Sequence, residues 1–139
     1  DTDSHVNTLA RFCDVRTIAY VQSDDPADAH DGALRRMEEE LRTFRTADGR
    51  PYTLIPLPMA DAAYDPDDGH RLPATYANFL ILNGAVLVPT YASPKDALAL
   101  ARLDRAFPGR EIIGIDCRPL IRQHGSLHCV TMQFPTRFL

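Results

Sequence analysis

The order of secondary-structure signals constrains this fold most, because the same order occurs twice along the chain. In the first copy, two strand-like segments precede a helix, and a third extended segment follows it. The expected strands cover residues 6–13, 17–22 and 52–56. The helix is expected to begin at Asp25-Pro26, which supplies an N-cap side chain and a proline at the first helical position. The sequence therefore predicts a strand–strand–helix–strand (ββαβ) module over residues 1–58.

The second copy contains the strongest short-range signal in the chain. Asn83-Gly84 lies between two apolar runs and predicts a two-residue hairpin turn. The segment from Ser93 to Asp96 repeats the cap, the proline and the first-turn acid, and a helical stripe follows it. The expected strands of this copy cover residues 76–82, 85–91 and 112–115. A second ββαβ module is therefore predicted over residues 75–117, which makes the fold α/β.

Two further segments complete the expected organisation. Residues 59–74 are rich in Pro, Asp and Gly and form a loop that is either a binding loop or a solvated linker. Residues 118–139 form a tail with one more strand, Gly125 to Gln133, which has no partner hairpin. Because two repeats close a core poorly, we expect further modules before Asp1.

Composition disfavours several classes of protein. The net charge of −4 and a pI near 5.7 leave no basic surface for nucleic acid or an anionic membrane, whereas a small cationic substrate is compatible. No run approaches the roughly 20 apolar residues that span a bilayer. Three cysteines are an odd number without disulfide spacing, so we expect reduced thiols and a cytoplasmic protein.

The tail carries the residues best suited to chemistry. Cys117, His124, His128 and Cys129 fit no standard zinc spacing, and neighbours on a strand point to opposite faces, so we expect no metal. An inert, buried Cys129 is one alternative. Gly125 favours the other, a reactive thiol, because it allows a ligand to approach the backbone closely.

A cysteine nucleophile needs a base or a charged partner, and the first residues supply a candidate. His5 lies beside Asp1 and Asp3 at the entry to the first expected strand. His5 and Asn7 should share a face of that strand. His30 lies at the start of a helix and is expected to be solvated.

Five segments together resemble the C-terminal half of the agmatine deiminase family. They read D-T-D-S-H-V-N-T-L-A-R-F, F-R-T-A-D-G-R-P-Y, L-P-A-T-Y-A-N-F-L-I-L-N-G-A-V-L-V-P, F-P-G-R-E-I-I-G-I-D-C-R and H-G-S-L-H-C-V-T-M-Q. The resemblance implies a guanidine-modifying enzyme whose fold is a five-bladed α/β propeller (pentein) of ββαβ modules. This chain would supply about two modules and a C-terminal strand.

The resemblance also implies a mechanism. Cys129 matches the family nucleophile and His5 the general acid/base, while Asn7, Gly125 and Asp3 are expected to bind the substrate. Thiol attack on agmatine would release ammonia and leave a covalent thiouronium, which water hydrolyses to N-carbamoylputrescine. No cofactor is expected, and a homo-oligomer is compatible with the sequence.

Two departures from the family leave alternatives open. The family pattern is His-x-Asp, whereas Asn7 is neutral, and the N-terminal half that supplies another substrate carboxylate is missing from the chain. The fragment alone is therefore expected to be inactive. The alternatives are deimination of peptidyl or free arginine, or a non-catalytic binding or assembly module of the same fold.

Overall fold

The computed structural model describes residues 5–134 and contains two similar α/β units. In the first, strands β1 (Ala10–Phe12) and β2 (Thr17–Gln22) are antiparallel, and helix α1 (Asp31–Thr43) leads to β3 (Thr53–Pro58), parallel to β2. In the second, β6 (Leu80–Ile81) and β7 (Ala85–Thr90) are antiparallel, and α2 (Asp96–Ala106) leads to β8 (Glu111–Asp116), parallel to β7. Each unit forms its own three-stranded sheet with its second strand in the centre.

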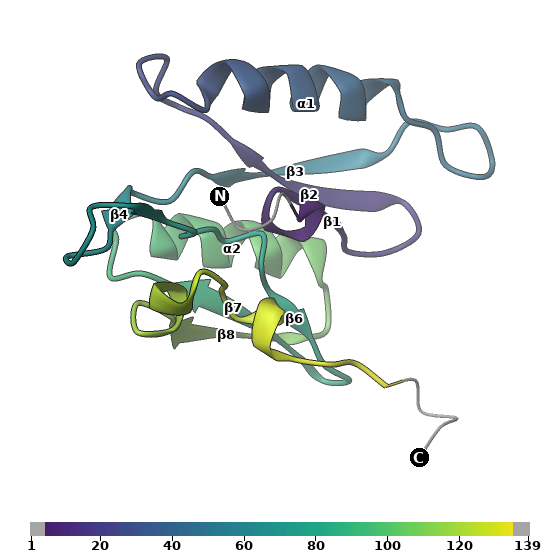
Figure 1. The fold of residues 1–139 in the computed structure, drawn as a ribbon. Helices are drawn as coiled ribbons and strands as arrows, with labels where there is room; N and C mark the ends of the chain where they lie inside the picture. Colours follow the sequence, from purple (N-terminus) through teal and green to yellow (C-terminus); the bar gives the residue numbers. More distant parts are fainter. Residues whose placement is uncertain (1–4, 135–139) are drawn as a thin grey trace.

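The elements stack in four layers, with α2 between the two sheets (Figure 1). The fully buried Leu103 of α2 belongs to one core cluster with Ala19 of β2 and Val86 of β7. Helix α1 covers the opposite face of the first sheet, where Leu41 packs with Ile18. The first sheet is thus covered on both faces, which explains why its central strand β2 reads as a continuous apolar run rather than an alternating one.

The hairpin expected at Asn83-Gly84 is confirmed. Leu80 pairs with Leu87, and the Leu82 amide donates to the Ala85 carbonyl at 2.8 Å, which leaves the two turn residues between the strands. The resulting register turns Val86 and Val88 toward α2.

The expected first helical residue, Pro26, is wrong by five residues, since α1 begins at Asp31 with His30 as its N-cap. The Asp25 carboxylate accepts the Ala27 amide at 2.9 Å, and the Asp28 carboxylate accepts the His30 amide at 2.8 Å. These two successive turns satisfy backbone amides locally, and such side-chain turns compete with a helix.

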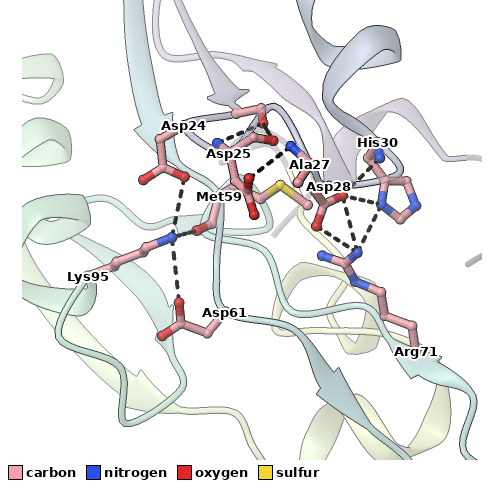
Figure 2. A network of polar contacts seen from close by, with 10 residues as sticks. Asp24, Asp25, Ala27, Asp28, His30, Met59, Asp61, Arg71 and Lys95 are labelled. Carbon is pink, nitrogen blue, oxygen red and sulfur yellow. Dashed lines mark hydrogen bonds and ion pairs between the residues drawn. The ribbon is translucent and has the colours of Figure 1, made fainter.

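The loop expected over residues 59–74 contains a short hairpin, β4 (Ala63–Tyr64) with β5 (Arg71–Leu72). Figure 2 shows how this region is held. Arg71 lies 3.0 Å from the Asp28 carboxylate, and Lys95 reaches the Met59 carbonyl at 3.0 Å and Asp24 at 3.4 Å. The hairpin and the start of α2 are therefore tied to the turns before α1.

The strand expected over Gly125–Gln133 is also wrong. Residues His128–Val130 form a single 3-10 turn (η3), in which the Cys129 amide donates to the Ser126 carbonyl and the Thr131 amide to the His128 carbonyl, both at 3.1 Å. Because these amides and carbonyls form hydrogen bonds within the turn, they do not pair with a neighbouring strand.

A further difference concerns residues 76–82, where only Leu80–Ile81 is a strand. Residues 76–79 are completely buried without belonging to a helix or strand, and we call residues 75–79 the buried strap. Within residues 5–134, no helix is both long and apolar enough to cross a bilayer.

We predict that Leu103→Ala destabilises the full chain by about 2–5 kcal/mol, because it leaves a cavity between both sheets. Urea-induced unfolding measures this loss. The matched control is Leu98→Ala on the exposed side of α2, which should cost less than about 0.5 kcal/mol. Equal losses in the two variants would contradict the central position of α2.

Candidate active site

The three thiols differ sharply in exposure. Burial raises the pKa of Cys13 to about 12 and also raises the pKa of Cys117, which is completely buried. Cys129 is exposed. Because the nucleophile must reach a substrate as a thiolate, Cys129 is the thiol suited to chemistry.

Cys129 lies in the η3 turn, and the side chain of Asn78 holds this turn in place. The Asn78 Oδ1 atom accepts the His128 amide at 2.8 Å and the Cys129 amide at 3.3 Å. The same oxygen lies 3.4 Å from Cys129 Sγ, within hydrogen-bonding distance for sulfur. Asn78 is completely buried, so its carboxamide is a fixed support beneath the thiol.

A second turn, from the other end of the chain, meets the same asparagine. Residues Val6–Thr8 form a 3-10 helix (η1), closed by the Thr8 hydroxyl donating to the His5 carbonyl at 2.7 Å. Asn78 Nδ2 donates to the Asn7 carbonyl at 3.3 Å, and the Thr75 hydroxyl donates to the Thr8 carbonyl at 2.6 Å. The buried strap therefore joins the His5–Thr8 turn to the Cys129 turn.

Side chains from the two turns also meet directly. Asn7 Nδ2 lies 3.4 Å from His128 Nδ1, although the two residues are 121 positions apart. Burial, followed by the nearby positive charge of Arg11, lowers the pKa of His128, which favours the neutral imidazole. The Asn7 Oδ1 atom is buried, and no group within residues 5–134 donates a hydrogen bond to it.

Arg11 is a half-buried cation beside this site. Its guanidinium lies over the Phe79 ring, with Cζ 4.8 Å from the ring centroid, and it donates to the Phe79 carbonyl. Burial lowers the pKa of Arg11, and the nearby Cys13 and Cys129 thiols oppose that shift. Arg11 therefore places positive charge near the exposed thiol.

The hydroxyl groups of Tyr91 and Ser126 form hydrogen bonds next to the buried strap. The Tyr91 hydroxyl lies 2.8 Å from Ser126 Oγ, donates to the Thr75 carbonyl and accepts the Thr75 amide, the last two at 3.0 Å. Burial raises the pKa of Tyr91 well above its usual range, so the hydroxyl stays protonated. These contacts connect the Cys129 turn to β7.

The sequence-predicted site residues are only partly brought together. Cys129, Gly125 and Asn7 lie in or beside the two joined turns, and Asp3 lies outside the described residues. His5 is exposed, and within residues 5–134 no hydrogen bond joins its ring to Cys129. The expected shared strand face for His5 and Asn7 is wrong, because η1 replaces that part of the strand.

His128 and Cys129 lie in a turn, so the alternation of a strand does not place their side chains on opposite faces. In the part of the chain that the structure describes, His, Cys, Asp and Glu side chains form no group of three able to hold a metal ion.

A cavity of 440 Å³ lies on another part of the molecule. It is lined by the β4–β5 hairpin and by the segment after β8, including Asp61, Tyr64, Arg118 and Arg122. Cys129, His5 and Asn7 do not line it, so it is not the candidate active site.

Sequence analysis missed the supporting residues Asn78, Arg11 and Tyr91. One signal was present, since Asn78 is a polar residue inside an otherwise apolar run, Tyr76 to Leu82. A polar residue in a buried segment must find hydrogen-bond partners, which marks it as a connection to other segments.

We predict that Gly125→Ala slows alkylation of Cys129 in the full chain. An added Cβ would lie 2.9 Å from the Cys129 Cβ, so the thiol turn has to shift. Mass spectrometry of the Cys129 peptide after timed iodoacetamide treatment measures the rate. Gly84→Ala is the control, because nothing lies within 4 Å of a Cβ there, and equal rates in both variants would contradict the close packing.

Similar proteins are found by family model, by sequence and by structure. Residues 1–135 match the model of the Porphyromonas-type peptidyl-arginine deiminase family. An agmatine deiminase of Pseudomonas fluorescens is 30% identical over 151 residues, which cover 97% of this chain and 41% of that protein. The C. jejuni agmatine deiminase structure has 41% identity and a TM-score of 0.83, over 92% of this chain and 38% of that one.

A Porphyromonas gingivalis protein, provisionally assigned as an arginine deiminase, has 64% identity and a TM-score of 0.92 over 96% of this chain and 39% of that one. This chain thus spans about two fifths of the length of the relatives it matches. The match over nearly all of its residues shows that it belongs to the Porphyromonas-type peptidyl-arginine deiminase family.

Proposed function

We propose that this chain carries the nucleophile and the general acid/base of a guanidinium deiminase, with agmatine as the substrate. The observation that carries the proposal is the meeting of the His5–Thr8 turn and the Cys129 turn on one buried asparagine. A cysteine nucleophile with a histidine partner needs this kind of convergence from distant segments. Curated relatives named agmatine deiminase support the substrate, as does a C. jejuni cysteine-to-serine variant solved with substrate bound.

The proposed reaction has two steps. The Cys129 thiol passes its proton to His5 as Sγ attacks the central guanidinium carbon and a C–S bond forms. One C–N bond then breaks as the departing nitrogen takes this proton from His5 and leaves as ammonia. Water then gives a proton to His5 and attacks the same carbon. The C–S bond breaks, and N-carbamoylputrescine and the free thiol are released.

The two ββαβ units are proposed to be two blades of a five-bladed propeller. Their equal strand orders and the likeness to the longer deiminase chains support this arrangement. Sequence outside these residues would complete the substrate cavity and supply a further carboxylate. Activity is therefore assigned to the assembled domain.

Asn7 would hold a guanidinium N–H where the family has an aspartate. Its Oδ1 atom is an acceptor without a partner within residues 5–134, which a substrate donor could satisfy. An amide lacks the charge of a carboxylate, and a lost charge-assisted hydrogen bond costs about 2 kcal/mol.

We predict that Asn7→Asp in the full-length protein raises kcat/KM for agmatine by about 30-fold, because it restores a charged pair worth about 2 kcal/mol. Chromatography of N-carbamoylputrescine measures the rate. Asn83→Asp, in an exposed turn, controls for a change in net charge. A decrease or no change with Asn7→Asp would contradict the assigned role of position 7.

The same substitution should raise the pKa of His128, since a carboxylate would then lie beside Nδ1. In the parent protein, burial holds this pKa below its ordinary value, so the ring stays neutral to lower pH than a free histidine. Titration of the His128 ring by NMR measures both values. An unchanged midpoint in the Asn7→Asp variant would show that the two side chains do not interact.

A second candidate is deimination of arginine, which the family description and the P. gingivalis relative favour. Parallel assays of the full-length protein with agmatine, free arginine and an arginine peptide separate the two. Citrulline as the sole product would overturn the agmatine assignment. No product from any of them, with Cys129 intact, would favour a non-catalytic module.

A further inference from the structure

We propose that Asn78 is a positioning residue of this site, whose carboxamide fixes the Cys129 thiol relative to the His5–Thr8 turn. The inference rests on the proposed function, because it concerns the placement of the two groups that would carry out the reaction. Asn78 does not touch the solvent, so it acts through the residues it holds.

The chemistry of the carboxamide matches its surroundings on both sides. On one side, Oδ1 meets three donors, the His128 amide, the Cys129 amide and the Cys129 thiol. On the other, Nδ2 donates to the Asn7 carbonyl. Only a side chain with an acceptor and a donor on one planar group satisfies both turns at once.

Neighbouring contacts attach the segment around Asn78 to β1 and to both turns. The Phe79 carbonyl accepts the Arg11 guanidinium, and the Thr75 hydroxyl, which also accepts the Ala77 amide at 3.2 Å, donates to the Thr8 carbonyl. The Asn78 carbonyl itself accepts the His128 amide at 3.1 Å. Several hydrogen bonds therefore hold the backbone that carries the carboxamide. The carboxamide in turn fixes the position of the Cys129 thiol.

A positioning role predicts a specific kinetic pattern. Because the buried carboxamide does not reach bulk solvent or a bound substrate, its removal should leave substrate affinity nearly intact. The thiol and the His5–Thr8 turn would lose their fixed relation, and a displacement of about 1 Å costs on the order of 100-fold in rate. Removal of the Asn78 carboxamide should therefore lower kcat and leave KM nearly unchanged.

The test uses the full-length protein with two substitutions at position 78. Asn78→Leu keeps the branched heavy-atom shape and removes every polar contact of the side chain, and it should lower kcat for agmatine about 100-fold with KM within about threefold. The rate at which 2-chloroacetamidine alkylates Cys129, followed by peptide mass spectrometry, should also fall about 100-fold. Asn83→Asp, in the exposed hairpin turn, should match the parent protein.

Asn78→Asp gives a readout that a structural role would not produce, and it replaces Asn78→Leu if that variant does not fold. A protonated carboxyl keeps the acceptor and still donates to the Asn7 carbonyl, whereas a carboxylate loses that donor. The ratio of variant to parent alkylation rates should therefore fall as pH rises from about 5 to about 9.

The outcomes separate this inference from the function on which it rests. If the parent protein alkylates Cys129 no faster than Cys13, the proposed function fails and the inference fails with it. The other outcome is a parent protein that alkylates Cys129 faster than Cys13, with folded position-78 variants that keep the parent alkylation rate or change KM without lowering kcat. That result would overturn positioning by Asn78 and leave the proposed function standing.

Discussion

The buried carboxamide of Asn78 is the interaction on which the candidate site depends. It joins segments 71 and 50 residues away in sequence, and both of its polar atoms are bonded although the side chain is completely buried. Burying an amide without partners costs about 1–3 kcal/mol, so folding of the strap and formation of both turns favour each other. The exposed thiol is therefore placed by the protein interior rather than by its own short turn.

The layered packing explains why the strap is available for this task. Helix α2 is buried between the two sheets, and its contacts fix β3 and β8 relative to each other. The strap runs from the β4–β5 hairpin to β6 within the same core cluster. The Thr75 hydroxyl and the Asn78 carboxamide meet the two turns, whereas the Tyr76 hydroxyl donates to Asp96 at the start of α2.

Local sequence predicted the repeated module order and the Asn83-Gly84 turn, because these depend on neighbouring residues and on simple periodicity. It failed where long-range hydrogen bonds decide the conformation. Residues 76–79 look like a strand, but the side chain and the carbonyl of Asn78 bond to the two turns instead, and His128–Val130 fold into the turn that Asn78 holds. The early helix start failed for a local reason, the two aspartate turns before Asp31.

The candidate nucleophile was identified through family resemblance, whereas its supports were not. Cys129 and Asn7 lie in segments that resemble the family, and Asn78 joins their two turns, but the pairing of Asn7 with His128 has no counterpart in sequence spacing. Neutral Asn7 leaves one buried acceptor unused within residues 5–134, which makes position 7 the principal departure from a charged guanidinium site.

Covalent catalysis by Cys129 is the central claim, and trapping the intermediate tests it most directly. The full-length protein is mixed with agmatine, quenched with acid at short times, digested, and the Cys129 peptide is weighed by mass spectrometry. The account predicts an amidino adduct on Cys129 that appears before N-carbamoylputrescine and decays as the product forms. Turnover with no adduct on this peptide at any time, or with the adduct on Cys13 instead, would contradict it.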